Sequence, residues 1–297
     1  MKILVLGATG MLGHKLMQVL SKKFQLTGTV RGETRAFAAN PIFSGMNLLG
    51  NTRADDISSI EAAISQAAPD VVINCIGIVK QLPAAQDPLA SISINALFPH
   101  QVAKICRDRN IRMIHVSTDC VFSGNKGNYT EDDPSDAEDL YGKSKFLGEV
   151  YYPGCLTLRT SIIGRELGSS HGLVEWFLGQ EGKTVPGFKK AIFSGLTTQA
   201  LAGIMGEIIS DYPKLHGLVQ VASAPISKYD LLKLVKSAYG LNITIVPDER
   251  VVNNRSLSAD KFRRETNIKI PSWEYMIDEM HRDPTPYAIL RGHHAQQ

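Results

Sequence analysis

The chain has 297 residues, of which 43% are hydrophobic and 21% charged, a composition typical of a soluble globular protein with one large domain or two smaller ones. Its formal net charge is only +3 and basic residues run no longer than pairs, which argues against nucleic-acid binding. The four cysteines show no metal-ligand spacing, so we expect no metal site. We expect a cytoplasmic protein without membrane contact, because no apolar run reaches the roughly 18 residues of a membrane span and no signal-peptide pattern is present.

Short apolar, β-branched runs alternate with amphipathic segments through the first two thirds of the chain. Strands buried on both faces and separated by helices are typical of βαβ units, so the sequence predicts an α/β fold with a Rossmann-type, doubly wound parallel sheet. The expected strands span residues 3–6, 26–30, 71–73, 111–116 and 155–158. The expected amphipathic segments span residues 11–21, 57–67, 92–109, 144–150, 198–209, 226–239 and 273–280.

The regularity falls after about residue 161, where glycine-rich turns begin. We therefore expect a cofactor-binding domain over residues 1–160 and a smaller C-terminal α/β substrate-binding domain over residues 161–297. The chain is expected to return to the first domain near residues 190–220. The terminal RGHHAQQ is polar, and its paired histidines are expected to be a tail and not ligands.

The segment KILVLGATGMLG, residues 2–13, has the pattern of a strand, a glycine-rich turn and the start of a helix. Gly7 can turn sharply out of the strand, Gly10 lets the backbone approach a diphosphate, and Gly13 lets the helix pack closely on the sheet. Since the first helical N–H groups then face the diphosphate, this loop is predicted to bind a dinucleotide. The alternative is a tight turn that happens to be rich in glycine. Further residues expected to contact the cofactor here are Thr9, Met11 and Leu12.

The second expected strand ends in QLTGTVRGETR, where an NAD-type fingerprint would place an acidic residue for the ribose 2′-hydroxyl. Arg31 stands there instead, with Arg35 nearby, and a guanidinium fork suits a 2′-phosphate. We therefore expect NADPH as the preferred cofactor. NADH is the alternative, with Glu33 binding the ribose and Arg31 in solvent.

Small and polar residues follow two further strands, at the edge of the sheet where open α/β folds bind ligands. The segment VVINCIG places Asn74, Cys75, Ile76 and Gly77 there, and Cys75 is expected to be a small thiol packed against the cofactor and not a nucleophile. The next strand ends in HVSTDCVFSG, which places Ser117 and Thr118 at the same edge, with Ser117 expected to contact the cofactor. Taken alone, these two hydroxyl groups could equally serve to form a turn and have no catalytic role, and Asp119 could be a helix cap.

The segment DLYGKSKFLGE, residues 139–149, places Tyr141 and Lys145 four residues apart. On a helix the two side chains share a face. An ammonium group and the positive ring of a cofactor stabilise a phenolate and lower the pKa of the phenol, so the pair is suited to acid–base catalysis. Lys143 is expected to point into solvent. The Tyr-x-x-x-Lys spacing alone occurs by chance in many proteins. It is more specific for a catalytic pair when it follows a Ser/Thr at a strand end and an N-terminal glycine loop, as it does here.

Together these motifs resemble an extended short-chain dehydrogenase/reductase. Within that group, the segments VSTDCVFSG, YTEDDPSD, YGKSKFLGE and LRTSIIG resemble the branch of dTDP-4-dehydrorhamnose reductases. The resemblance is dense to about residue 165. It implies that Thr118 binds the substrate carbonyl, that Tyr141 donates the proton and that Lys145 modulates the tyrosine and binds the nicotinamide ribose. It also implies a cofactor role for Asp56, Ile57 and Asn95, although Asp56 could instead be an N-cap and Asn95 a buried amide.

The sequence departs from this branch at Cys120, where a tyrosine or similar residue is usual, and around Lys80 and Gln81, where the sugar would lie. The exact sugar is therefore left open. An anionic nucleotide sugar requires cations and a slot for its base. The candidates are Lys80, Arg165, Lys189, Lys190 and Arg255 for the cations, and Trp176 or Phe193 for the base.

The resemblance implies NADPH-dependent reduction of the C4 keto group of a nucleotide-activated 6-deoxy-4-ketohexose, for deoxysugar and surface polysaccharide biosynthesis, by a monomer or homodimer. One alternative is an epimerase or dehydratase that retains NAD. Another is a non-catalytic regulatory subunit with the same fold.

Overall fold

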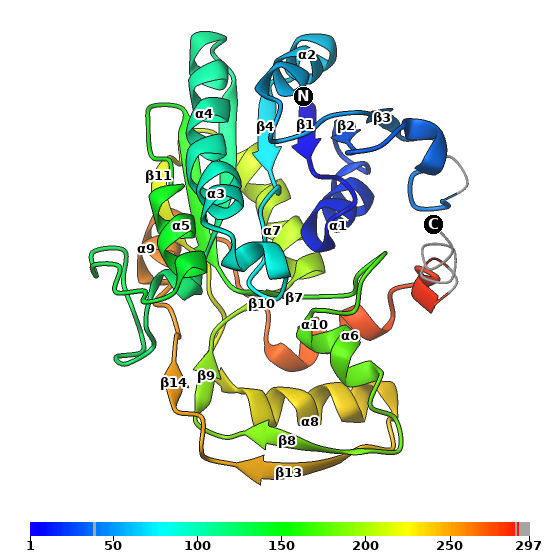
Figure 1. The fold of residues 1–297 in the computed structure, drawn as a ribbon, viewed down its shortest axis with the longest axis vertical. Helices are drawn as coiled ribbons and strands as arrows, with labels where there is room; N and C mark the ends of the chain where they lie inside the picture. The colour runs from blue at the N-terminus through cyan, green and yellow to red at the C-terminus, as the bar shows by residue number, and fades with distance from the viewer. Residues whose placement is uncertain (38–39, 289, 291–297) are drawn as a thin grey trace.

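A computed structural model describes residues 1–37, 40–288 and 290 of the chain. Within them, seven strands form a parallel sheet in the order β11-β6-β5-β4-β1-β2-β3 (Figure 1). The chain builds outward from β1 in both directions, which is the doubly wound arrangement that the strand–helix alternation predicts. The strands are β1 (Lys2–Leu6), β2 (Gln25–Thr29), β3 (Asn47–Leu49), β4 (Val71–Asn74), β5 (Arg112–Thr118), β6 (Cys155–Thr160) and β11 (Gly217–Gln220).

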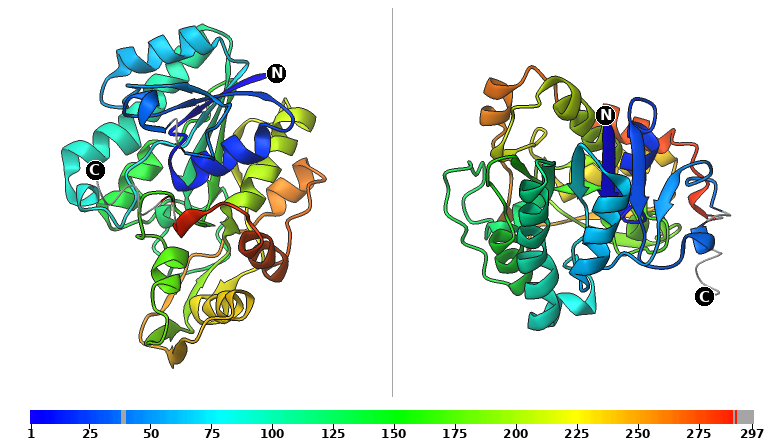
Figure 2. Two further views of the ribbon diagram at one scale, coloured as in Figure 1. Left: turned by 90° about the vertical axis from the view of Figure 1, so that its right-hand side faces the viewer. Right: turned by 90° about the horizontal axis from the view of Figure 1, so that it is seen from above.

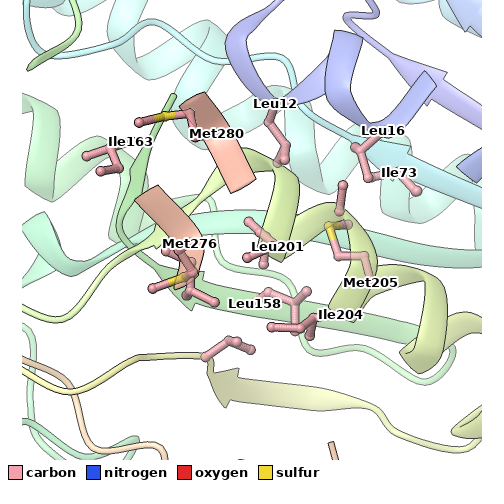
Figure 3. Close-up of a cluster of buried hydrophobic side chains, with 14 of the residues drawn as sticks. Leu12, Leu16, Ile73, Leu158, Ile163, Leu201, Ile204, Met205, Met276 and Met280 are labelled. Carbon is pink, nitrogen blue, oxygen red and sulfur yellow. The ribbon is translucent and has the colours of Figure 1, made fainter. Parts of the chain in front are cut away.

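Helices cover both faces of this sheet, because its strands are apolar on both faces (Figure 2). Along β1, Ile3 and Val5 belong to one core cluster and Leu4 and Leu6 to the other. The first cluster lies under α1 (Met11–Leu20) and α7 (Thr198–Asp211), and the second under α2 (Ile57–Ala67) and α4 (Phe98–Asp108). Figure 3 shows part of the first cluster, with side chains from α1, α7, α10 and the sheet: Leu12, Leu16, Ile73, Leu158, Leu201, Met205 and Met276.

A smaller lobe lies on the side toward which β1 and β4 point (Figure 1). Its strands form small pairings, in which β13 runs parallel to β8 and β9 lies between β12 and β14. The lobe contains β8 (Thr184–Phe188), β9 (Ala191–Phe193), β12 (Ile226–Ser227), β13 (Thr244–Asp248) and β14 (Asn253–Asn254), with α6 (Leu173–Leu178) and α8 (Lys228–Tyr239). The paired strands β7 (Ile162–Ile163) and β10 (Leu196–Thr197) and the helix α10 (Trp273–His281) lie between it and the sheet, and α9 (Asp260–Glu265) lies beside β11 (Figure 1).

The predicted fold class is confirmed, and the differences in detail have local causes. β3 is missing from the prediction because it has three residues and is at most half-buried. The segment expected over residues 92–109 begins earlier, as α3 (Pro88–Ser91), because the Asp87 carboxylate caps the first N–H groups. It then passes through a π-helical turn, η3 (Ile92–Leu97), before α4. The helix expected over residues 144–150 is α5 (Leu140–Leu147), since Asp139 caps its start.

Two further findings concern the ends and the surface of the chain. Among the described residues, no helix is both long and apolar enough to cross a membrane. The terminal histidines lie outside the described residues. The short elements not yet mentioned are η1 (Thr34–Phe37), η2 (Pro83–Gln86) and η4 (Asp119–Val121).

Candidate active site

The glycine loop between β1 and α1 forms a narrow cradle. Gly7 has a φ of +84°, a conformation that other residues rarely adopt. A Cβ on Gly13 would stand 2.0 Å from the carbonyl oxygen of Gly7, so only glycine fits where α1 crosses the loop. Gly10 is exposed and has space beside it, and the first turn of α1 carries no acidic side chain. This end of α1 therefore suits the diphosphate of a dinucleotide, with Thr9 and Met11 half-buried beside it.

The arginine expected to select the cofactor lies directly after β2. Arg31 is exposed. The hydrogen bond that Asp55 accepts from Arg53 is the main cause that lowers the pKa of Asp55, and the charge of Arg31 makes a smaller contribution in the same direction. Arg35 instead pairs with Glu33, in an exposed ion pair. Asp56 accepts hydrogen bonds from the backbone N–H and the hydroxyl of Ser58, at 3.1 and 2.5 Å, so it is the N-cap of α2.

The end of β4 brings Asn74, Cys75, Ile76 and Gly77 to the same edge of the sheet as the glycine loop. The side-chain Oδ1 of Asn74 accepts the N–H of Ile76 at 3.0 Å, where the chain turns out of the strand. Ile76 in turn lies against the loop, since a Cβ on Gly7 would meet its Cγ1 at 3.0 Å. Burial raises the pKa of Cys75 to about 12, so this residue is a thiol and not a nucleophile at neutral pH.

Asn95 ties the loop after β4 to the helix that carries the tyrosine. It lies in the π-helical turn η3, where its Oδ1 accepts the N–H of Ile78 at 2.8 Å and its Nδ2 donates to the Ile78 carbonyl at 3.0 Å and to Ser144 Oγ at 3.4 Å. A Cβ on Gly77 would stand 3.3 Å from Asn95 Oδ1 and 3.9 Å from Lys145 Nζ. The buried amide thus lies beside the lysine.

Thr118 and Tyr141 meet where β5 ends and α5 begins. Thr118 Oγ1 accepts the N–H of Cys120 at 3.1 Å, and a hydrogen bond between Thr118 and Tyr141 lowers the tyrosine pKa. Burial outweighs the effect of this hydrogen bond and raises the pKa of Tyr141 above its ordinary value, so the phenol is protonated at neutral pH. The close approach requires Gly142, since a Cβ there would stand 2.2 Å from the carbonyl oxygen of Cys120.

Lys145 is buried one turn after Tyr141. Its ammonium donates to the carbonyl oxygen of Val116 at 2.8 Å. Burial lowers its pKa from 10.5 to about 8, while the negative charge of Glu149 opposes that change. The lowering of the phenol pKa by the Lys145 ammonium together with the positive ring of a bound cofactor, which the sequence suggests, stays a prediction. Lys143 is exposed, as predicted.

The predicted substrate cations fall into two groups. Lys80 and Arg255 lie near the strand ends, and Lys80 pairs with Asp139 at 2.6 Å. Burial raises the pKa of Asp119, and the positive charge of Arg255 opposes that rise; the same charge contributes to the lowered pKa of Asp139. Arg255 also donates to the carbonyl of Phe122 at 2.8 Å, which fixes it beside η4.

Arg165 and Lys189 are engaged elsewhere. The Arg165 guanidinium donates to Glu175 at 2.6 Å and lies 4.5 Å from the centre of the Tyr287 ring. Lys189 and Lys190, on the turn between β8 and β9, pair with Glu249 at 3.4 and 3.0 Å. Of the candidates for a base slot, Trp176 is 36% exposed on α6, whereas Phe193 is buried against Trp273.

Two polar residues that the sequence did not single out lie under this site. Glu149 and Arg159 form an ion pair with side-chain exposures of 1% and 2%. Glu149 is four residues after Lys145, a spacing that could have drawn attention to it, but its partner lies on β6. Among the described residues, no group of three or more His, Cys, Asp or Glu side chains stands where it could hold a metal ion.

Comparison with known proteins is consistent with this geometry. Residues 1–211 match the family described as the RmlD substrate binding domain. A dTDP-4-dehydrorhamnose reductase from Streptomyces griseus is 30% identical over 149 residues, covering 49% of this chain and 43% of the relative. One from Burkholderia thailandensis is 27% identical over 319 residues, covering 95% and 99%. In three of the most similar relatives the match spans 43% to 62% of the relative's own length.

Among solved structures, dTDP-4-dehydrorhamnose reductase from Bacillus anthracis in complex with NADP superposes with a TM-score of 0.77 at 19% identity, covering 94% of this chain and 98% of that one. At this identity the likeness concerns the fold.

Proposed function

Because the chain belongs to the RmlD substrate-binding-domain family of extended short-chain dehydrogenases/reductases, we propose that it reduces the C4 keto group of a nucleotide-activated 6-deoxy-4-ketohexose with NADPH. The observation that carries this proposal is the meeting of Thr118, Tyr141 and Lys145 at the carboxyl edge of the sheet, opposite the glycine loop. Relatives named as dTDP-4-dehydrorhamnose reductases support the choice of a 4-keto sugar.

The side chains have complementary tasks in this reaction. When bound, the nicotinamide supplies the hydride that C4 receives. The Thr118 hydroxyl hydrogen-bonds to the keto oxygen, and Tyr141, held protonated by burial, donates its proton to that oxygen as the C–O double bond becomes a single bond. The Lys145 ammonium then stabilises the phenolate that remains.

The cofactor fits the cradle at Gly7, Gly10 and Gly13, where added side chains would fill the space or strain the backbone. Arg31 supports NADPH over NADH, because an exposed guanidinium at this position suits the 2′-phosphate. Gly77 and Asn95 are proposed to line the nicotinamide end, beside Lys145. The NADP of the Bacillus anthracis reductase is in accord with this preference.

The nucleotide sugar is proposed to enter from the smaller lobe, between Lys80 and Arg255. Both cations lie near Asp139, two residues before Tyr141, so an anionic substrate could exchange with the Lys80–Asp139 ion pair. We further propose a division into domains of residues 1–160 and 161–297, a cytoplasmic location, a monomer or homodimer, and a role in deoxysugar and surface polysaccharide biosynthesis.

Consumption of NADPH with a panel of 4-keto-6-deoxyhexoses, linked to dTDP, UDP or GDP and carrying a hydroxyl or acetamido group at C2, tests the proposal. We expect turnover of at least one member and its loss in Tyr141→Phe. Equal turnover by Tyr141→Phe contradicts the mechanism. Epimerisation without consumption of NADPH, by protein that copurifies with NAD, supports an epimerase instead. A stable complex with another protein and no turnover supports a regulatory subunit.

A further inference from the structure

Glu149 is a buried carboxylate behind the Tyr141–Lys145 pair, with no part in the steps described above. Building on the proposed function, we propose that Glu149 is a positioning residue: it fixes the end of α5 to β5 and provides the negative charge that keeps Lys145 an ammonium. Both effects follow from its contacts, which join three elements of the Rossmann sheet and its covering layer.

The first effect is a pair of links between α5 and consecutive residues of β5. Glu149 Oε1 accepts the hydroxyl of Ser117 at 2.6 Å, and Lys145 Nζ donates to the carbonyl of Val116 at 2.8 Å. Ser117 lies directly before Thr118, so these links hold the strand end that carries the threonine and the helix that carries Tyr141 in one register. A shift of either element would break both bonds.

The position of Glu149 is itself tightly fixed. Arg159 donates to it through two nitrogens, Nε to Oε1 at 2.9 Å and Nη2 to Oε2 at 2.7 Å. The chain leaves α5 at Gly148, where a Cβ would stand 1.9 Å from the carbonyl oxygen of Asn95. The backbone before Glu149 therefore packs directly on η3, and the carboxylate cannot move away without loss of these contacts.

The second effect is electrostatic. Burial penalises the charged form of Lys145, and the carboxylate of Glu149 is the largest influence that favours it. The other titratable or charged groups around the lysine are Cys75 after β4, held as a thiol, His115 on β5, held neutral by burial, and the protonated Tyr141. Arg159 on β6 pairs with Glu149, so its positive charge acts against that of the carboxylate.

Two variants separate these effects. Glu149→Gln/Arg159→Met removes both buried charges together, which avoids an unpaired arginine, and the glutamine can still accept the Ser117 hydroxyl. Ser117→Ala removes that hydrogen bond and leaves both charges. Asp108→Asn, which breaks the exposed Lys104–Asp108 pair, is the control for loss of a carboxylate.

Lysine labelled with ¹³C at Cε allows Lys145 to be titrated by NMR without any substrate, its signal being the one absent from Lys145→Met. In Glu149→Gln/Arg159→Met we expect the Lys145 pKa to fall by about one pH unit, with the alkaline limb of kcat shifted equally. In Ser117→Ala we expect an unchanged pKa and a kcat about tenfold lower at every pH. KM for NADPH should change little in either, and Asp108→Asn should match the wild type.

An unchanged Lys145 titration in a folded Glu149→Gln/Arg159→Met protein overturns the electrostatic effect, and wild-type kcat in Ser117→Ala overturns the positioning effect. If the double variant does not fold, the kcat of Ser117→Ala alone tests the role of Glu149 through its positioning effect. If no keto sugar is turned over by the wild type but the Lys145 titration shifts as expected, the proposed function fails and the coupling of Glu149 to Lys145 stands.

Discussion

Gly13→Ala tests how closely α1 packs on the glycine loop. The new Cβ would stand 2.0 Å from the Gly7 carbonyl oxygen, 2.9 Å from its carbonyl carbon and 3.0 Å from Ala8 Cα. Ordinary carbon–oxygen contacts are about 3.3 Å, so the loop or the helix must move by more than about 1 Å. All three atoms are backbone, and overpacking of this kind costs about 3 kcal/mol of unfolding free energy. The Tm should fall by about 6 to 12 °C.

Gly203→Ala is the matched control, since Gly203 also lies within a helix, α7, and has no atom within 4 Å of an added Cβ. There the higher helix propensity of alanine should stabilise the protein by about 1 kcal/mol. Denaturant unfolding of the two variants should therefore give changes of opposite sign. In Gly13→Ala the displaced loop should also lose about one charge-assisted hydrogen bond to the diphosphate, raising Kd for NADPH about tenfold. Wild-type stability and NADPH binding in Gly13→Ala would refute the close packing.

Further predictions concern single groups. Tyr141→Phe should lower kcat by about 10²- to 10⁴-fold while NADPH still binds, because the proton donor is lost. The kcat of the wild type should fall above about pH 8 as Lys145 loses its charge; a profile flat up to the ordinary lysine pKa of 10.5 would contradict this. Arg31→Glu should lower kcat/KM for NADPH about tenfold to 100-fold and spare NADH, and an unchanged ratio excludes Arg31 as the 2′-phosphate ligand. His14 is buried with its pKa lowered from 6.5 to about 4, so protons bind the unfolded chain first as the pH falls between these values. Denaturant unfolding should then show a loss of about 3 kcal/mol over that window, absent from His14→Asn.

The fold and the centre of the candidate site could be predicted from sequence because their signals are local. The glycine spacing, the strand ends and the Tyr141–Lys145 pair each lie within about a dozen consecutive residues, and parallel strands bring their carboxyl ends to one edge. α5 illustrates the limit: its start depends on the capping carboxylate of Asp139, not on the amphipathic pattern that follows.

What could not be predicted depends on residues from distant parts of the chain. Arg165 resembles a substrate cation in sequence, but Glu175 and the ring of Tyr287, more than 100 residues later, surround it. Glu149 looks like a surface residue at a helix end until Arg159 on β6 is placed opposite. Tertiary contacts decide such roles.

Transfer of deuterium from C4-labelled NADPH tests the proposed reduction most directly. With an accepted nucleotide-linked 4-keto-6-deoxyhexose, the account predicts one NADPH oxidised for each sugar reduced, with the label bound to C4 of the product, and the same transfer about 10²- to 10⁴-fold slower in Tyr141→Phe. Conversion of the sugar with no deuterium gained at C4 and no NADPH consumed would contradict it.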